Sequence, residues 1–294
     1  MCSSDLPSTM TGRVLVTGAG GWIGGRLEET LRASGTSVVG AGHNHENSLE
    51  LRLLDDVRAL VADVRPDVVF HLGGTSRLAE LLRDPASGNQ NVVQPAVNVL
   101  EALASLGSGT RLVLVSPAEV YGRVGRVPTD EASPLVPVDL YASARAAVEY
   151  MSRGYAARGV DVRIARVFWC VGPGQGRGTL LGDAAWSAAN GTTLRIGDPE
   201  LRRDVVDVRD VVAGLVRTAE HAAPGTATNL CSGRAWRVGD LLDAVGVRWE
   251  VDTSLARPTD VPILLGSPAR AEALGWQRRH PVEETLRALR PRDP

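Results

Sequence analysis

A tyrosine and an arginine stand four residues apart in the stretch YASAR, which runs from Tyr141 to Arg145. The surrounding LYASARAAVEYMSR (140–153) has helical periodicity, so both side chains should lie on one face of a helix. A phenol can give a proton to a carbonyl oxygen or take one from a hydroxyl, and a cation one helical turn away favours its ionised form. The pair is therefore a candidate for acid/base chemistry at a substrate oxygen. The alternative is a surface arginine on an amphipathic helix.

A glycine-rich stretch, VTGAGGWIGG (16–25), offers a second kind of chemistry. Three glycines recur at three-residue spacing between an apolar strand and a helix. In that order they permit a tight turn, a close approach of backbone to a pyrophosphate, and close packing of the helix on the strand. Amides at the helix N-terminus would then hold the phosphates of a dinucleotide. The expected contacts are Gly18, Gly21, Trp22, Ile23 and Gly24.

The end of the next predicted strand, SVVGA (37–41), bears on which dinucleotide would bind. An acidic residue at this place would hold the hydroxyls of the adenosine ribose. The segment instead reads GAGHNHEN (40–47), with Gly42 and His43 at the expected position. Because no carboxylate there repels a 2′-phosphate, the sequence slightly favours NADP over NAD. His43 is either a cofactor contact or a solvated loop histidine.

Short apolar runs alternate with helical segments along the first part of the chain, which predicts a parallel sheet covered by helices. After Phe168 the pattern loosens into short elements. We therefore expect an α/β protein, with a Rossmann-type doubly wound parallel sheet over 11–170 and a smaller substrate-binding lobe over 171–294. Some segments of that lobe should return to the sheet, and residues 1–10 should form a disordered tail. The predicted strands are 13–18, 37–41, 66–72, 111–116 and 161–168, and the predicted helices are 22–33, 55–64, 91–103 and 140–153.

The composition argues against several classes of partner. The 294 residues carry 32 basic and 34 acidic side chains, a net charge of −2, and their dispersal disfavours nucleic acid and anionic membranes. No apolar run approaches the roughly 20 residues of a membrane span, and the first ten residues do not resemble a signal peptide. Cys2, Cys170 and Cys231 lack metal-ligand spacing. We expect a cytoplasmic protein that binds no metal and acts on a small molecule.

Nine consecutive blocks of the chain resemble the extended short-chain dehydrogenase/reductase family, which includes NAD-dependent epimerases, dehydratases and reductases of sugar nucleotides. The resemblance implies NAD or NADP as cofactor, a nucleotide sugar as substrate, and a homodimer formed through helices such as 91–106 and 140–157. The blocks are TGAGGWIG, PDVVFHLGG, NVVQPAVNVLEA, VSPAEVYG, SPLVPVDLYASAR, RVFWCVGPGQ, RRDVVDVRDVV, NLCSGRAWRVGDLL and RPTDV.

The resemblance assigns Tyr141 as the catalytic acid/base, but Arg145 stands where the family has a lysine. Arginine keeps the positive charge and loses the ability to relay a proton, because its guanidinium stays protonated. The chain contains no lysine at all, so this exchange follows a bias of the whole sequence.

Further departures occur in VSPAEVYG, where the family's catalytic serine or threonine falls on Pro117. Ser116 is one residue early and should point to the opposite face of a regular strand, so only a local distortion would let it substitute. The Asp-Glu pair of the dehydratases reads Ala118-Glu119 here, so elimination of water is not expected. Glu119 is either an acid/base near the substrate or an ordinary carboxylate at a strand exit.

The resemblance also implies the remaining contacts. Arg203 and Arg257 would grip a diphosphate, since guanidinium groups fit phosphate oxygens, although an Arg–Asp structural network is the alternative. Trp169 replaces an asparagine of the family, and its indole would favour an aromatic or apolar substrate. Cofactor contacts are expected from Leu72, Gly73, Gly74 and Phe168, and substrate contacts from Thr75, Glu119, Trp169, Arg203, Arg257 and Asp260.

Three functions remain open on the sequence alone. The leading hypothesis is NAD(P)-dependent 4-ketoreduction of a deoxysugar nucleotide or C4 epimerisation, both by hydride transfer. The second is reduction or rearrangement of a non-nucleotide carbonyl compound of secondary metabolism. The third is a cofactor-binding module without catalysis, which Pro117 and Arg145 together favour and Tyr141 opposes.

Overall fold

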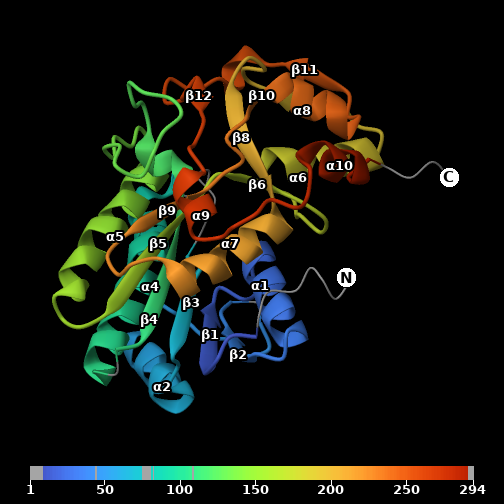
Figure 1. Cartoon of the computed structure of the whole chain (residues 1–294). Coiled ribbons are helices and arrows are strands. Elements are labelled where there is room, and N and C mark those ends of the chain that lie inside the picture. The colour runs from blue at the N-terminus through green and yellow to red at the C-terminus, as the bar shows by residue number, and fades with distance from the viewer. Residues whose placement is uncertain (1–8, 44, 75–80, 82, 108, 291–294) are drawn as a thin grey trace.

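A six-stranded parallel sheet with helices on both faces forms the main body of the protein (Figure 1). The computed structural model describes residues 9–43, 45–74, 81, 83–107 and 109–290. The strand order is β2-β1-β3-β4-β5-β9, and every neighbouring pair is parallel, which confirms the expected Rossmann-type sheet. The strands are β1 (Arg13–Thr17), β2 (Ser37–Ala41), β3 (Val68–His71), β4 (Arg111–Pro117), β5 (Asp161–Val167) and β9 (Ala227–Leu230).

Side-chain alternation along the strands divides the core between the two faces of the sheet. Val14 and Val16 of β1 face one helix layer, whereas Leu15 between them faces the other. Because both faces are buried, the strands read as near-continuous apolar runs. We call the second of these faces the α5 face. Helices α1 (Trp22–Ala33) and α7 (Val208–His221) cover the first face, and α2 (Leu54–Val64), α4 (Pro85–Leu106) and α5 (Leu140–Ala156) cover the α5 face.

The strand order reverses at β1, which lies between β2 and β3. The chain passes from β1 to β2 on one side and then returns to β3 on the other side. In open α/β sheets, ligands bind at such a switch point, outside the carboxyl ends of the strands. The glycine loop follows β1 and the segment 72–74 follows β3, so the topology brings both to this point.

A smaller lobe continues from the carboxyl end of β5 (Figure 1), where β6 starts at Trp169. Its central strand is β8, which pairs with β6, β10 and β12. The lobe elements are β6 (Trp169–Val171), β7 (Leu194–Ile196), β8 (Arg202–Asp207), β10 (Ala235–Arg237), β11 (Trp249–Val251), β12 (Ile263–Leu264), α6 (Leu180–Ala189), α8 (Val238–Val245) and α10 (Val282–Ala288). Two short 3₁₀ helices are η2 (Ala118–Tyr121) and η3 (Thr253–Leu255).

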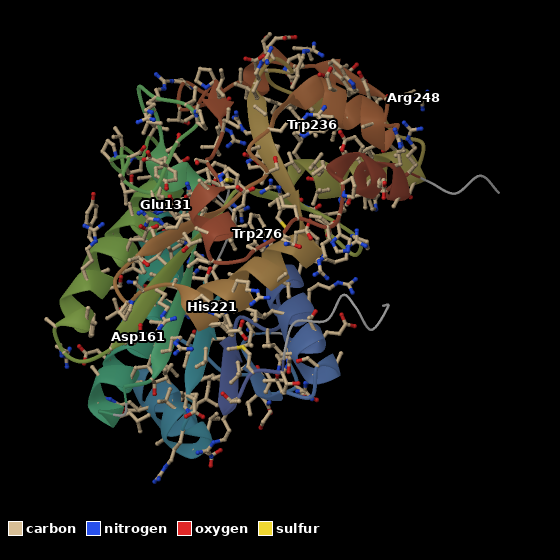
Figure 2. The ribbon with its side chains drawn as sticks, viewed as in Figure 1. Glu131, Asp161, His221, Trp236, Arg248 and Trp276 are labelled. Carbon is tan, nitrogen blue, oxygen red and sulfur yellow. The ribbon has the colours of Figure 1, made fainter. Side chains whose placement is uncertain are left out.

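Three elements from the second part of the chain, α7, β9 and α9 (Ala269–Ala273), belong to the main body, and α9 packs against β9 and α7. Helix α7 packs on the sheet, and β9 extends the sheet beside β5. Trp276 lies where the segment after α9 meets α7 (Figure 2), and its Nε1 donates to the backbone oxygen of Asp210 at 2.8 Å. This buried contact joins the segments of the second part to the Rossmann body.

The expectation that residues 1–10 form a disordered tail is wrong for its last residue, Met10. Residues 1–8 of the expected tail lie outside the described residues. Met10, however, is only 5% exposed and packs in the core, and its backbone N–H donates to Thr36 Oγ1 at 3.1 Å. None of the helices in the described part of the chain is both long enough and apolar enough to span a membrane.

Candidate active site

The glycine loop after β1 is built for close approach of backbone to backbone. Gly18 has φ +81°, and a Cβ there would lie 2.7 Å from the backbone nitrogen of Gly73. A Cβ on Gly24 would lie 2.2 Å from the oxygen of Gly18, so the helix can approach the strand only because this residue is glycine. The Gly21 amide donates to the Gly18 oxygen at 3.0 Å. This geometry has the form that a dinucleotide-binding loop requires.

Two residues next to the glycines serve packing as well. Trp22 Nε1 donates to the backbone oxygen of Pro173 at 3.1 Å, which links the start of α1 to the segment after β6. Ile23 is partly buried against the core of the main body. These packing contacts fix the positions of Trp22 and Ile23 before any cofactor binds.

A carboxylate does lie at the end of β2, but it comes from α1. A Cβ on Gly40 would lie 2.4 Å from Glu28 Oε2, so the buried Glu28 side chain covers this part of β2. Arg32 binds Glu28 Oε1 at 2.6 Å and His45 binds its Oε2 at 3.0 Å. His43 is exposed beside them. The sequence missed Glu28 because it comes from a helix and not from the strand end.

Glu28, His45 and Glu46 are also the described residues whose oxygen and nitrogen atoms come close enough together to hold a metal ion. His45 already uses both ring nitrogens, since its Nδ1 accepts a hydrogen bond from the Asn47 amide at 3.1 Å and its Nε2 contacts Glu28. This cluster is distinct from the Tyr141–Arg145 pair.

Arg145 is buried beside Tyr141 on the inner side of α5. Its guanidinium carbon lies 5.4 Å from the centre of the Tyr141 ring, and the residue is 5% exposed. Asp139 caps the helix by accepting a hydrogen bond from the Ala142 amide at 2.8 Å, which fixes the first turn. A Cβ on Gly74 would lie 3.5 Å from Arg145 Nη2, so the arginine faces the loop after β3. The alternative of a surface arginine is therefore wrong.

His71, the last residue of β3, is a third polar group of this region that sequence reasoning did not single out. Its Nδ1 lies 2.7 Å from Thr17 Oγ1. Burial, and after it the charge of Arg145, lower the pKa of His71 to about 3. His71 is therefore neutral at physiological pH and adds no second positive charge beside Arg145. A histidine in the otherwise apolar run PDVVFHL was the signal available in the sequence.

Ser116 and Pro117 end β4 and point to opposite faces of the sheet. The strand stays paired with β5 through both residues, so it has no distortion that would exchange them. Leu112 and Leu114 face the α5 face, and alternation places Ser116 on the same face. Ser116 is 2% exposed, and its Oγ has no hydrogen-bond partner among the described residues. The serine hydroxyl thus already faces the helix layer that carries Tyr141.

A buried ion pair anchors α5 two turns after its tyrosine. Glu149 Oε2 binds Arg166 Nη2 of β5 at 2.7 Å, and both side chains are fully or almost fully buried. Arg166 Nη1 donates to the Tyr121 hydroxyl at 2.8 Å, which donates to Asn229 Oδ1 at 2.7 Å. Although burial opposes it, bonding to Glu149 raises the pKa of Arg166, and burial raises the pKa of Tyr121 to about 12.

This network holds four chain segments, η2, α5, β5 and β9, in one arrangement around the site. Tyr141, Arg145 and Glu149 follow one another at four-residue spacing, so one face of α5 carries the candidate acid/base, its cation and the buried anion. Sequence reasoning missed the network. The charged Arg166 inside the strand DVRIARVF (161–168) was its visible trace.

The wall toward the lobe contains Glu119, Trp169 and Arg203. Trp169 Nε1 donates to Glu119 Oε1 at 3.1 Å, and the Arg203 guanidinium carbon lies 5.3 Å from the Trp169 ring centre. Burial raises the pKa of Glu119 and lowers that of Arg203. These three expected substrate contacts are therefore brought together.

The loop 257–261 closes the same corner. The Arg257 amide donates to Asp260 Oδ2 at 2.9 Å, while Arg257 itself is exposed. Arg123, which sequence reasoning missed, donates through Nη2 to the oxygens of Pro258 at 2.6 Å and Asp260 at 3.3 Å. Of the other expected contacts, Thr75 lies outside the described residues, and Leu72 donates its amide to the Thr17 oxygen at 2.9 Å.

Phe168 occupies a different place from the one expected. It is 2% exposed and packs with Tyr121, Cys231 and Leu264 in a small core cluster. Its side chain therefore fills the interior beneath the site and does not form an accessible cofactor surface.

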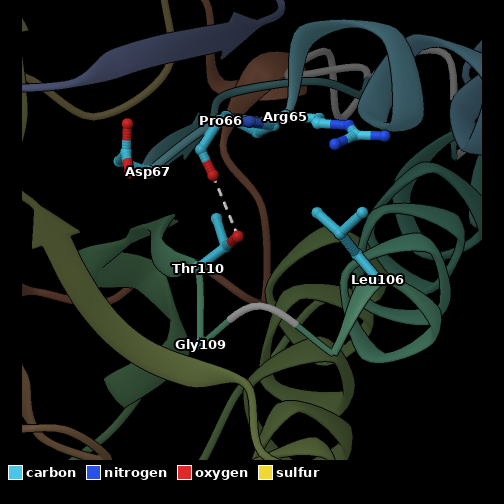
Figure 3. Close-up of a pocket in the computed structure, with 6 residues that line it drawn as sticks. All are labelled: Arg65, Pro66, Asp67, Leu106, Gly109 and Thr110. Atoms are coloured by element: carbon cyan, nitrogen blue, oxygen red, sulfur yellow. Dashed lines mark hydrogen bonds between the residues drawn. The ribbon is translucent and has the colours of Figure 1, made fainter.

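A cavity of about 420 Å³ lies at the amino ends of the strands, opposite to the glycine loop (Figure 3). It is lined by residues that precede β3 and β4, and Thr110 Oγ1 donates to the Pro66 oxygen across it at 2.9 Å. These are the amino ends of parallel strands, so the cavity is remote from the glycine loop and from Tyr141. Its lining residues are Arg65, Pro66, Asp67, Leu106, Gly109 and Thr110.

Comparison with known proteins identifies the family. The sequence model of the NAD dependent epimerase/dehydratase family matches residues 14–231. The chain belongs to this family. The GDP-6-deoxy-D-mannose reductase of Pseudomonas aeruginosa is 30% identical over 95% of this chain and 96% of its own length. The UDP-glucose 4-epimerase of Mycolicibacterium smegmatis is 30% identical over 93% of this chain and 96% of its own length.

Solved structures of the NAD dependent epimerase/dehydratase fold agree. The structure of RMD from Pseudomonas aeruginosa complexed with NADPH superposes with a TM-score of 0.84 at 29% identity, covering 95% of this chain and 97% of the other. A UDP-glucose 4-epimerase from Thermus thermophilus in complex with NAD superposes with a TM-score of 0.84 at 25% identity, covering 94% and 96%. The chain is thus an NAD(P)-dependent enzyme of the short-chain dehydrogenase/reductase type.

Proposed function

We propose that this family member is an NAD(P)-dependent oxidoreductase that transfers a hydride at C4 of a nucleotide-activated sugar. 4-Ketoreduction of a deoxysugar nucleotide is the favoured reaction, and C4 epimerisation is the second. The observation that carries the proposal is the burial of Arg145 against Tyr141, directly beside the glycine-lined switch point. A module without catalysis would have no need of a buried cation against this tyrosine, since burying charge is costly.

The chain's residues would divide the chemistry as follows. When bound, NAD(P)H supplies the hydride. Backbone amides at the start of α1, from Trp22 onward, would hold its pyrophosphate. Tyr141 gives its proton to the carbonyl oxygen of the substrate, and the charge of Arg145 stabilises the phenolate that remains. His71 is neutral at physiological pH, so it adds no positive charge next to that of Arg145.

Reduction suits these residues better than epimerisation does. Epimerisation needs a tyrosine that acts as base and then as acid, and Arg145 cannot relay the proton that a lysine would. Pro117 provides no hydroxyl, so the substrate oxygen depends more heavily on Tyr141. Ser116, whose Oγ lies buried on the α5 face, is the hydroxyl that remains for a supporting hydrogen bond.

For the cofactor, both NADPH and NAD have support. The Pseudomonas aeruginosa structure holds NADPH and the Thermus thermophilus structure holds NAD. We favour NADP(H), because Arg32 and His45 bind the carboxylate of Glu28 near the end of β2, so that Glu28 does not act as a lone negative charge there. His43 would be the exposed contact beside them.

For the substrate, we propose a nucleotide sugar whose diphosphate lies between Arg203 and Arg257, with Asp260 ordering the loop. The related proteins are named for GDP-6-deoxy-D-mannose and UDP-glucose, which supports this class. Thr75 and Glu119 would contact the sugar. A non-nucleotide carbonyl compound is the second candidate, which the large indole of Trp169 on the same wall favours.

We further propose a homodimer through α4 and α5, and a cytoplasmic location. Tyr150 and Met151 are exposed on α5, beside α4, and such apolar groups on a shared helix face suit a dimer. Free Cys170 and Cys231 suit a reducing compartment. Light scattering of the purified protein tests the dimer, and a monomer at micromolar concentration would contradict it.

The test is NADPH and NADH oxidation with 4-keto-6-deoxysugar nucleotides that carry GDP, UDP or dTDP. We expect turnover with one of them, and a kcat lower by about 10²–10⁴ in Tyr141→Phe with cofactor affinity kept. Tyr150→Phe, on the exposed side of the same helix, is the matched control. Turnover only with non-nucleotide ketones would favour the second candidate. Cofactor binding with equal, negligible turnover in all three proteins would favour a module without catalysis.

A further inference from the structure

Trp169 lies between an acid and a base of the substrate wall. Its indole N–H donates to Glu119 Oε1 at 3.1 Å, while the guanidinium of Arg203 lies over its ring at 5.3 Å from the centre. A tryptophan ring can serve both neighbours at once, because its N–H is a donor and its π face attracts cations. The resemblance implies an asparagine at this position, which has neither an aromatic face nor an indole N–H.

The acid and the base would otherwise attract each other. Arg203 is 6% exposed, and Glu119 is only partly exposed, so little water screens their charges. Each also favours the charged form of the other. Between these two described residues, however, no nitrogen and oxygen approach within the about 4 Å of an ion pair.

Arg203 is held in place by other groups. Its Nη1 donates to the backbone oxygens of Arg202 at 2.9 Å and Val261 at 2.8 Å. Its Nε and Nη2 make no hydrogen bond to the described part of the chain, so they remain for a ligand. The guanidinium is therefore positioned without being neutralised.

We infer that Trp169 is a spacer that keeps Glu119 and Arg203 apart, so that one site can bind a phosphate through Arg203 and a sugar hydroxyl through Glu119. The inference rests on the proposed nucleotide-sugar function. It assigns to Trp169 the role of keeping the site able to bind substrates that carry a diphosphate. Without the indole, the two charges would pair with each other. The wall would then lose its affinity for a diphosphate, although both residues are still present.

Two substitutions separate the role of the Trp169 aromatic ring from the role of its N–H. Trp169→Asn installs the family's residue, removes the ring and lets Glu119 reach Arg203. Trp169→Phe removes the N–H together with part of the ring system, and keeps an aromatic face between the charges. Trp186→Asn, at an exposed tryptophan of α6, is the matched control for loss of an indole in the lobe.

The probes are GDP, UDP and dTDP, titrated by calorimetry into protein saturated with NADPH. Among the three diphosphates, we take the one that the wild type binds most tightly. We expect Trp169→Asn to lower the affinity for it by about tenfold or more, which corresponds to the loss of one charged hydrogen bond. Trp169→Phe and Trp186→Asn should stay within about threefold of the wild type. Adding Glu119→Gln to Trp169→Asn should restore affinity to within about threefold, because the competing carboxylate is gone.

The outcomes distinguish this inference from the proposed function. If the wild type binds NADPH but none of the three diphosphates, the nucleotide-sugar function fails and the inference fails with it. If the wild type binds a diphosphate and Trp169→Asn binds it equally well, only the spacer is refuted. An unrestored double variant would also refute the spacer, because the loss would then come from packing. A crystal structure of Trp169→Asn gives a test without ligand, and Glu119 and Arg203 should lie within ion-pair distance in it.

Discussion

The buried neutral His71 makes the stability of the protein depend on pH between 5 and 7. Burial and the charge of Arg145 lower the pKa of His71 from 6.5 to about 3 in the folded state. Below pH 6.5 the unfolded chain therefore binds one proton more than the folded chain, and the folded state loses stability as the pH falls. With these two pKa values, the loss from pH 7 to pH 5 is about 2 kcal/mol.

The perturbation that isolates this effect is His71→Gln, which removes the titrating ring and keeps an amide near Thr17. Free energies of unfolding from urea denaturation at pH 7, 6 and 5 give the comparison. The variant will be less stable at every pH, so the quantity of interest is the slope. We expect the wild type to lose about 2 kcal/mol more than His71→Gln between pH 7 and pH 5.

His221→Gln on α7, at an exposed histidine, is the control and should keep the wild-type slope. Equal slopes for the wild type and His71→Gln would refute the reasoning, because His71 would then titrate alike in the folded and unfolded states. That result would also remove the reason for treating His71 as neutral beside Arg145.

Two further predictions concern the support of the site. Glu149→Gln should lower the free energy of unfolding by about 3–5 kcal/mol in urea denaturation, because it leaves the buried Arg166 without its counter-charge. A loss below about 1 kcal/mol would show that the pair does not anchor α5. Arg123→Ala should raise the KM for the nucleotide sugar by about tenfold with kcat nearly unchanged, because Arg123 orders the loop 257–261 through two carbonyl oxygens. Arg126→Ala, at a side chain 82% exposed on the loop that carries Arg123, is the control, and equal KM values in both variants would contradict the assignment.

The sequence predicts the local elements of the Rossmann body well, because their signals lie within short windows. The helix predicted over 22–33 is observed as Trp22–Ala33, and the strand predicted over 37–41 as Ser37–Ala41. Helix α4 begins at Pro85, six residues before the predicted start at 91. Its first six residues, PASGNQ, include no large apolar side chain, and its start is set by the Asp84 cap on the Ser87 amide, which apolar periodicity does not detect.

The site divides along the same line. The closeness of Tyr141 and Arg145 follows from four-residue helical spacing and could be predicted. Glu149 and Arg166 are 17 residues apart and belong to different elements, so only the folded chain brings them together. The same holds for Glu28 at the end of β2 and for the contact of Trp169 with Glu119, 50 residues away. No local pattern encodes such pairs.

Pro117 remains the departure that matters most for the chemistry. It removes a hydroxyl donor from the end of β4, and β4 stays regular, so Ser116 remains on the α5 face, where its hydroxyl can support that donor's role without taking its position. The proton needed at the substrate oxygen therefore depends on Tyr141, with Arg145 as the charge behind it. This is a site suited to one-way reduction.

The most direct test of the central claim is isotope transfer from NAD(P)H deuterated at C4 of the nicotinamide to the sugar. In the presence of a 4-keto-6-deoxysugar nucleotide, mass spectrometry and NMR should find one deuterium at C4 of the sugar product, formed at least about 10² times more slowly by Tyr141→Phe. Reduced product without deuterium, or equal rates in the wild type and Tyr141→Phe, would contradict hydride transfer with Tyr141 as the proton donor.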